Sequence, residues 1–454
     1  MVPVVMTGPS REEQPRLTIT GQQRQTILNA FEEGHYVMGI TILGGLCNSN
    51  GYQPDYPLIR QLLYLSLYPH EPIKDSMDGS DLQRATFPTL AATEAANLLL
   101  GTLADRLSPS HLLPALPSYP AIGELPSASP PRINHDTSIS KVVIMAERLA
   151  HCRACWDVLK QDFVSPLRTE RRTLPGSPTK RSDMGSRSGS TTSPHIVGSR
   201  SWFTLHWLLQ LFEKDEQEAE RTTGVRYSPL LLTQIPNRLS EQKKKWDATV
   251  PLDIAFFCAE RGERQDEAQR LFSLLCNLTC SAEFDGPMFV NSLATRFYPG
   301  YDYAETVISI LPETTRFAVC CALLALPTRG EARGRARKQP IARRKKANSI
   351  GNEGAPPDSP TMSVVNSNPA ILRPPSEIVD LLKSTWGDEA DALVVKFHLL
   401  HSYLDLRHPV PVGENDVDWE NMLRTGAMDQ IVEATFASRQ DLMDYLLAKL
   451  ATCS

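Results

Sequence analysis

The chain has 454 residues, of which 41% are hydrophobic and 35 are proline, and its formal net charge at pH 7 is −5. This composition favours ordered blocks separated by loops, and so small a net charge indicates neither nucleic-acid binding nor membrane attachment for the chain as a whole. No stretch approaches the roughly 18 continuous apolar residues of a membrane span, and the N-terminus resembles neither a secretory signal nor a mitochondrial presequence. The nine cysteines, an odd count, fit reduced thiols in the cytosol or nucleus. We therefore expect an intracellular protein without a membrane partner.

The N-terminal part is predicted to form a series of short helices. Residues 1–16 are expected to be disordered, and a helical block covers residues 17–107. Thr20 can cap the first helix, and an extension of that helix past Gly34 stays open. Two later helix starts precede apolar side chains at helical spacing. Short helices with short breaks are typical of stacked helical hairpins, although the sequence shows no fixed-period repeat.

The next part of the chain alternates between loops and one helix. Residues 108–136 are rich in proline and serine, which predicts a loop. Residues 137–168 carry apolar side chains at helical spacing, which predicts a helix. Residues 169–199 contain almost no large apolar side chains, so burial cannot offset the entropy lost on ordering, and we expect disorder.

The strongest core block covers residues 200–327. Trp202–Phe212 is apolar nearly all round, so we expect this helix to be central and buried, with the acidic residues 213–220 as its solvated extension. Thr315–Leu326 predicts another buried helix. No run shows sustained alternation of apolar and polar residues, so strands are at most a minor component.

The C-terminal part combines a linker and a last helical block. Residues 328–375 predict a disordered basic linker, and residues 376–453 predict helices that start at Ser376. The whole pattern indicates a mostly α fold: an irregular multi-helical bundle or helical-hairpin array interrupted by long disordered loops. Because each flanking block alone has a small core, we expect the ordered blocks to pack as one domain.

A basic run in this linker is the most informative local feature. It contains eight basic residues and no acidic one. An importin groove binds extended Lys and Arg side chains at regular spacing, so we interpret the run as a nuclear localisation signal with importin as a partner. Phosphate contacts with DNA or RNA, and an incidental solvated loop, stay as alternatives. The candidate residues are Arg333, Arg335, Arg337, Lys338, Arg343, Arg344, Lys345 and Lys346.

Ser-Pro pairs recur along the chain and indicate regulation by phosphorylation. Three of them, at Ser177, Ser193 and Ser359, lie in segments predicted to be disordered, where a kinase can extend its substrate. Ser349 lies three residues after Lys346, so a phosphate at Ser349 would weaken the basic run. Since serine and proline both abound in loops, chance pairing is the alternative.

The nearest approach to a metal motif is His151, Cys152 and Cys155. On a helix, Cys152 and Cys155 would face one side, and two thiolates at that spacing can share a zinc ion. A structural zinc site needs about four ligands, and the sequence offers no second CxxC pair. Small buried thiols beside Trp156 are the favoured interpretation, so neither a metal nor another cofactor is predicted.

A second ligand-like stripe consists of His398, His401, Asp405 and His408. These residues span about three helical turns, so they cannot all reach one ion. Pro409 also draws His408 out of helical geometry. We therefore expect His401 and Asp405 to form an ordinary i, i+4 pair.

Catalytic signatures are absent, because the sequence holds no phosphate-binding loop, dinucleotide-binding glycine motif, nucleophile elbow or zinc-protease helix. Its glycine pair, Gly44–Gly45, indicates a helix break or close packing. The leading hypothesis is a non-enzymatic nuclear scaffold or regulatory adaptor that binds other proteins, shuttles with the cytoplasm and is regulated by Ser-Pro phosphorylation. One alternative is a chromatin- or transcription-associated factor that contacts nucleic acid through residues 333–346. The other is an unrecognised metal-dependent enzyme.

Overall fold

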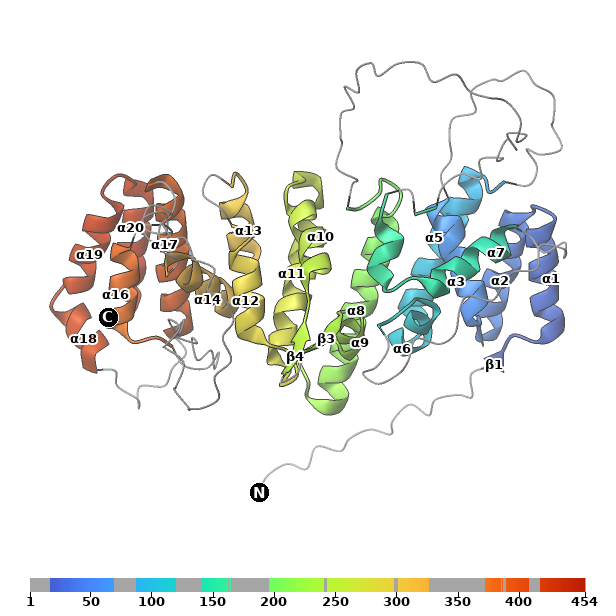
Figure 1. Ribbon diagram of the computed structural model, residues 1–454, viewed down its shortest axis with the longest axis horizontal. Helices are drawn as coiled ribbons and strands as arrows, with labels where there is room; N and C mark the ends of the chain where they lie inside the picture. Colours follow the sequence, from blue (N-terminus) through green and yellow to red (C-terminus); the bar gives the residue numbers. More distant parts are fainter. Residues whose placement is uncertain are drawn as a thin grey trace, which may run out of the picture. The chain divides into compact units, whose positions relative to one another are not determined.

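The protein is mostly helical, as the sequence predicted (Figure 1). Its contacts divide the chain into two compact units, Met1–Phe257 and Cys258–Ser454. Whether the ordered blocks form one domain stays a prediction. The computed structural model describes residues 17–68, 87–119, 141–161, 163–164, 196–240, 243–297, 301–325, 372–384, 386, 389–407 and 417–453.

The first unit consists of helices and two small sheets. In β1 and β2 the strands are parallel, with Leu17 opposite Tyr52, and in β3 and β4 they are antiparallel, with Asn237 opposite Trp246. Strands are thus a minor component of the described residues, as predicted. The elements are β1 (Leu17–Thr18), α1 (Gly21–Glu32), α2 (Tyr36–Asn50), β2 (Tyr52–Gln53), α3 (Tyr56–Leu67), α5 (Leu90–Arg106), α6 (Pro109–Leu112), the 3₁₀ helix η1 (Leu113–Ala115), α7 (Lys141–Glu147), the 3₁₀ helices η2 (Arg148–His151) and η3 (Cys155–Leu159), α8 (Trp202–Thr223), α9 (Pro229–Thr233), β3 (Asn237–Ser240), β4 (Lys243–Trp246) and α10 (Thr249–Ala259), which ends just past the boundary between the units.

Local sequence explains how α1 and α2 form a helical hairpin. Thr20 caps α1 in a capping box, in which its hydroxyl accepts from the Gln23 N–H (3.3 Å) and its own N–H donates to the Gln23 side chain (3.0 Å). The helix does not extend past Gly34, because Gly34 adopts a left-handed φ of 80° that turns the chain into α2. A Cβ added at Gly39 would lie 2.6 Å from the Phe31 ring, so glycine allows α2 to pack closely on α1.

Helix α8 is the centre of the first unit, as the apolar run predicted. Trp207 is 1% exposed, and its indole N–H donates to the Leu100 carbonyl of α5 (3.0 Å). Phe212 is fully buried against Trp156, with ring centroids 5.9 Å apart. The acidic extension continues the same helix up to Thr223.

The helix predicted over residues 137–168 is wrong in its length. The α-helical part ends at Glu147, and separate 3₁₀ turns follow. Contacts with Gln234 explain the break. The Cys155 N–H donates to the Gln234 side chain (2.9 Å), and the Trp156 indole donates to the Gln234 carbonyl (2.8 Å). These tertiary bonds replace helical ones, and local periodicity does not reveal them.

Two segments predicted as loop or disorder contribute to the core at their described ends. Within 108–136, α6 and η1 bury Leu112 and Ala115 completely, and the Arg60 guanidinium donates to the Ala115 carbonyl (2.8 Å). Within 169–199, the Gly198 N–H donates to the Leu159 carbonyl (2.8 Å). Composition over a long window misses such short buried stretches. The rest of both segments lies outside the described residues.

The second unit is also helical. Helix α14 packs on α17, where Phe317 stacks on Tyr403 with centroids 5.9 Å apart. Helix α16 begins at Pro375 rather than at Ser376, because proline at the first helical position needs no hydrogen bond to its nitrogen. The elements are η4 (Gly262–Arg264), α11 (Gln265–Asn277), η5 (Leu278–Cys280), α12 (Gly286–Ala294), α13 (Ala304–Ile310), α14 (Glu313–Leu324), α16 (Pro375–Lys383), α17 (Glu389–Arg407), α18 (Val417–Arg424), α19 (Ala427–Phe436) and α20 (Gln440–Cys453).

Lys214 of α8 holds the C-terminal end of α5. Its ammonium group donates to the carbonyls of Ala104 (2.9 Å), Asp105 (2.9 Å) and Leu107 (2.8 Å). The last carbonyls of a helix lack partners within the helix, and a cation there also interacts favourably with the helix dipole. Lys214 therefore fixes both the position and the end of α5.

We predict that Lys214→Ala lowers the free energy of unfolding of the first unit by about 1–2 kcal/mol, because three carbonyls lose a charged donor. Urea unfolding followed by tryptophan fluorescence measures the change. Gln217→Ala, at an exposed position of the same helix, is the matched control and should leave the unfolding midpoint unchanged. Equal midpoints for the two variants would contradict this account.

Candidate functional site

Helix α2 lies at the surface but carries no charged side chain over its 15 residues. One side of it is buried in the first unit, through Ile40, Leu43 and Cys47. On the other side, Val37 is 43% exposed and Met38 is 50% exposed. A helix that is apolar all round normally lies inside a protein, so an exposed side on such a helix is unusual.

Helix α5 lies beside α2, with the C-terminal ends of the two helices together. The Arg106 guanidinium donates to the side chain (2.6 Å) and the carbonyl (3.3 Å) of Asn48. Further back, a Cβ added at Gly44 would lie 3.6 Å from Leu99. The pair Gly44–Gly45 therefore does not break the helix, and the close-packing interpretation holds for Gly44.

The exposed sides of the two helices adjoin each other. On α5, Leu98 is 76% exposed and Leu90 is 58% exposed, whereas Leu100 on the opposite side is fully buried. Because Gly44 and Leu99 lie at the contact between the helices, the solvent-facing residues next to them flank the same seam. We define the α2–α5 face as Val37, Met38, Thr41, Gly45, Leu90, Leu98 and Gly101.

The surroundings of the α2–α5 face are acidic. Glu94 and Asp105 lie on the exposed side of α5, and Glu32 and Glu33 directly precede α2. Among residues 17–68 and 87–119, lysine is absent. The arginines of these two ranges all have partners in the first unit, namely Asp55 for Arg24, Glu147 for Arg60 and Asn48 for Arg106.

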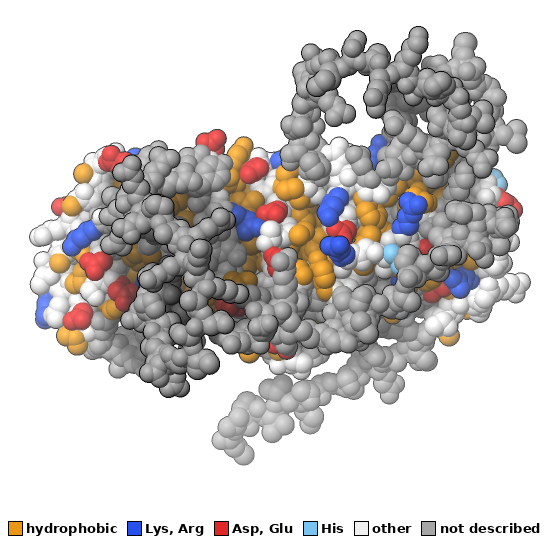
Figure 2. Space-filling view, viewed as in Figure 1, with side chains coloured by type: hydrophobic (Ala, Val, Ile, Leu, Met, Phe, Trp, Pro, Cys, Tyr) orange, Lys and Arg blue, Asp and Glu red, His pale blue; other side chains and the backbone are white. Residues whose placement is uncertain are grey.

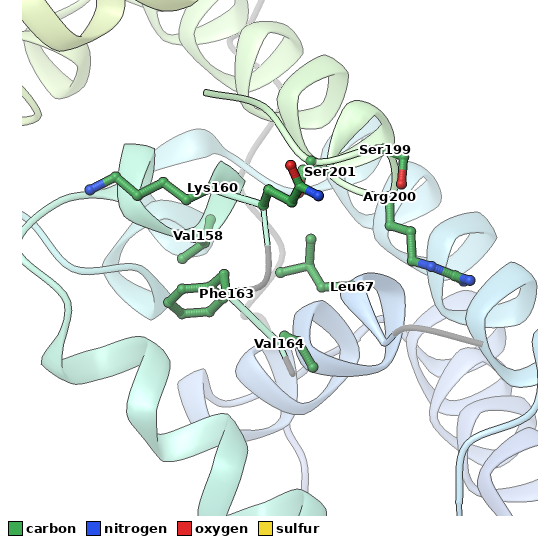
Figure 3. A pocket seen from close by; sticks show the side chains of 10 residues that line it. Leu67, Val158, Lys160, Phe163, Val164, Ser199, Arg200 and Ser201 are labelled. Atoms are coloured by element: carbon green, nitrogen blue, oxygen red, sulfur yellow. The ribbon is translucent and has the colours of Figure 1, made fainter. Parts of the chain in front are cut away.

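A hollow of about 110 Å³ lies between η3 and the start of α8 (Figure 3). Its two cations do not converge on a ligand, since Lys160 and Arg200 point in opposite directions in Figure 3. Lys160 pairs with Asp157 (2.6 Å), and Arg200 donates to the Tyr68 carbonyl (3.3 Å). The hollow is also smaller than ordinary small-molecule sites of roughly 300 Å³ or more.

A second hollow, of about 240 Å³, lies near β2 and α6. Tyr56 and His111 form one wall, with ring centroids 6.1 Å apart, and His111 is hydrogen-bonded to the Pro54 carbonyl (3.2 Å). The Gln53 side-chain nitrogen is buried there without a partner. This volume fits one side chain or a few water molecules better than a metabolite.

The two cysteines of the metal motif do not share a helix face, contrary to the prediction. Cys152 follows η2 with an extended backbone, and its thiol contacts the Arg148 carbonyl (3.4 Å). Cys155 is fully buried, and burial raises its pKa well above the usual range. Burial likewise raises the pKa of Cys152 to about 11. Both are therefore protonated thiols at neutral pH, which metal binding disfavours.

The predicted His401–Asp405 pair is confirmed, with Nδ1 3.0 Å from the Asp405 carboxylate. Two side chains of α20 complete the cluster, because His401 Nε2 lies 3.0 Å from the Tyr445 hydroxyl and 3.1 Å from the Lys449 ammonium. Lys449 also pairs with Asp405. Burial, together with Lys449, lowers the pKa of His401. This arrangement joins α17 to α20, and His408 lies outside the described residues.

The described part of the chain contains no group of three or more His, Cys, Asp or Glu side chains that could hold a metal ion. The basic run and the candidate phosphosites Ser177, Ser193, Ser349 and Ser359 all lie outside the described residues. One further Ser-Pro serine, Ser228, is fully buried at the start of α9. Its hydroxyl donates to Asp215 (2.6 Å) and accepts from the Leu231 N–H (3.0 Å), so this pair is a helix cap.

Sequence reasoning did not identify the α2–α5 face. The available signal was the complete absence of charge over Tyr36–Asn50, which helical spacing alone reads as a buried helix. Figure 2 shows what surface is usual in this protein, with hydrophobic side chains in separate stripes and charged side chains between them. Only the arrangement of α2 against α5 shows which of its apolar residues stay in solvent.

No protein-family model matches the chain, and no curated protein or solved structure is significantly similar to it. Among the described helices, none combines the length and the apolar character needed to cross a membrane. The functional argument therefore rests on the sites themselves.

His398 of α17 makes folding of the second unit sensitive to acid. Burial, with Arg316 and His401 nearby, lowers its pKa from 6.5 to about 4. Below pH 6.5 the unfolded chain takes up a proton at this position, but the folded chain does not do so until about pH 4. Stability that is fully present above pH 6.5 is therefore lost as the pH falls toward 4.

We predict that this histidine costs about 2 kcal/mol of unfolding free energy between pH 7 and pH 5. Urea unfolding of wild type and His398→Leu at both pH values measures it. The variant should lose correspondingly less stability on acidification. His35→Leu, at an exposed position, is the control and should behave as wild type. An identical pH dependence in His398→Leu and wild type would exclude this origin.

Proposed function

We propose that the chain is a helical scaffold or regulatory adaptor that acts through protein–protein contacts, and that the α2–α5 face is one of its binding surfaces. The observation that carries this proposal is the exposure of Leu98, 76%, beside a helix without a single charge. Burying a leucine side chain is worth about 1.5–3 kcal/mol, so several exposed apolar residues in one place favour association. Contiguous exposed apolar surface of this kind marks interaction sites.

The nuclear part of the proposal rests on the sequence. The basic run 333–346 supports nuclear import through importin, and the Ser-Pro pairs in the neighbouring segments support control by phosphorylation. The same run supports a second candidate function, in which the protein contacts DNA or RNA through Lys and Arg. No described residue adds support to a metal-dependent enzyme.

The scaffold proposal predicts that Leu98→Arg removes binding partners. A bulky cation in the middle of the α2–α5 face must be desolvated in any complex, which costs more than the lost leucine contact alone. Quantitative mass spectrometry after affinity capture compares this variant with wild type and with Val417→Arg. Val417 is 62% exposed on α18 and serves as the matched control.

We expect a defined set of proteins to be captured by wild type and by Val417→Arg, and to fall at least tenfold with Leu98→Arg. Circular dichroism should show the same helix content for all three chains, since both positions are exposed. If Leu98→Arg and Val417→Arg retain the same proteins as wild type, the face is not a binding surface.

The localisation proposal predicts that deletion of residues 333–346 moves a fluorescent fusion from the nucleus to the cytoplasm. Replacing Arg343, Arg344, Lys345 and Lys346 by alanine should weaken accumulation in the same direction. Unchanged nuclear accumulation would reject this role. Retention on DNA that falls steeply with salt and depends on the run would favour the nucleic-acid alternative.

A further inference from the structure

The α2–α5 face has features that identify the kind of partner it fits. We infer that it binds one amphipathic helix of a different protein, with small or apolar residues along its contact stripe and Lys or Arg along one flank. This inference rests on the proposed function and adds the chemistry of the partner. It follows from the shape of the face, its backbone, its glycines and its charge.

The shape of the face suits a helix. α2 and α5 contain 15 and 17 residues and run side by side in the same direction, as the contact between Arg106 and Asn48 requires. At 1.5 Å per residue they offer a seam of about 22–25 Å, the length of a helix of about 15 residues. A third helix packed along two others buries apolar side chains from both.

The backbone of the face excludes docking by strand addition. In α2 and α5 the main-chain N–H and C=O groups are used within the helices, so these elements offer no free strand edge. A partner backbone placed against them must satisfy its own hydrogen bonds, and a helix does so internally. An extended or proline-rich segment would leave its N–H or C=O groups without partners from the apolar seam.

Two glycines allow a partner to approach closely. A Cβ added at Gly45 or at Gly101 would have nothing within 4 Å, so neither residue is needed for packing inside the first unit. Gly39 differs, because a Cβ there would collide with Phe31. Glycine inside a helix lowers stability relative to alanine, so these two open positions have a cost without an internal benefit. Against a second helix, each would permit a short distance between the backbones.

The charges around the face select a basic partner. Glu94 lies one turn from both Leu90 and Leu98, and Asp105 lies further along the same side of α5. A second copy of this chain would place carboxylates against carboxylates, which disfavours self-association through the face. Lys or Arg on one flank of a partner helix would instead complement both carboxylates.

A display experiment tests the inference with defined probes. One library holds 18-residue peptides on an alanine- and leucine-based helical frame, with the outer positions varied among Lys, Arg, Glu and Gln. A second library holds proline-rich, extended peptides of the same length. Both are selected on the immobilised full-length chain, with the Leu98→Arg chain used to remove peptides that bind elsewhere.

We expect the helical library to be enriched at least tenfold over selection on Leu98→Arg, with Lys and Arg concentrated on one flank. The best peptide, measured by fluorescence anisotropy, should lose at least tenfold in affinity against Gly45→Leu and Gly101→Leu, while the thermal midpoints of these variants stay equal or rise. Val417→Arg should bind as wild type. The double variant Glu94→Lys, Asp105→Lys should prefer a matched peptide in which Glu replaces the basic flank.

Several results would overturn the inference. They are failure of the helical library to exceed the Leu98→Arg background, preference for extended or acidic peptides, a dimer in sedimentation that Leu98→Arg abolishes, and binding to anionic lipid vesicles that Leu98→Arg abolishes. Loss of captured proteins in Leu98→Arg without enrichment of helical peptides would leave the proposed function standing and reject only the helical partner. Failure of both experiments would reject the binding surface itself.

Discussion

The packing of α5 on α8 is the constraint on which the surface of the first unit depends. The Trp207 indole holds the Leu100 carbonyl in the middle of α5, and Lys214 holds the carbonyls at its end. With both points fixed, α5 cannot rotate about its axis. Because Leu98 lies about 200° around the helix from Leu100, a buried Leu100 obliges Leu98 to face solvent. The α2–α5 face is thus a consequence of buried contacts on the opposite side of the same helix.

The first unit does not use its glycines for one purpose. Gly39 is required by the close approach of the Phe31 ring, whereas Gly45 and Gly101 have open space where a side chain would be. Each of the latter costs about 0.5–1 kcal/mol relative to alanine. A protein stabilised only for itself would carry alanine there. Sites that forgo stability in this way are often sites where another molecule approaches.

In the second unit, burial rather than catalysis accounts for the unusual titration. His398 is 8% exposed, its Nδ1 has no partner, and it stays neutral because charging it would require desolvation. His401 is shared between Asp405 of its own helix and two side chains of α20, which holds the last helix in place. Perturbed histidines often mark active sites, but here their neighbours are structural partners.

Much of the architecture followed from the sequence by itself. Apolar spacing predicted the mostly α fold and the buried helix around Trp207, Thr20 predicted the start of α1, and the i, i+4 spacing predicted the His401–Asp405 pair. These features depend on neighbours within one or two helical turns, so local pattern contains them. The tertiary structure alone decided where α7 ends, because Gln234 captures the turn at Cys155 from far along the chain. It also decided that Leu98 and the uncharged side of α2 share one exposed face, since spacing shows which residues are apolar but not which of them find a neighbour.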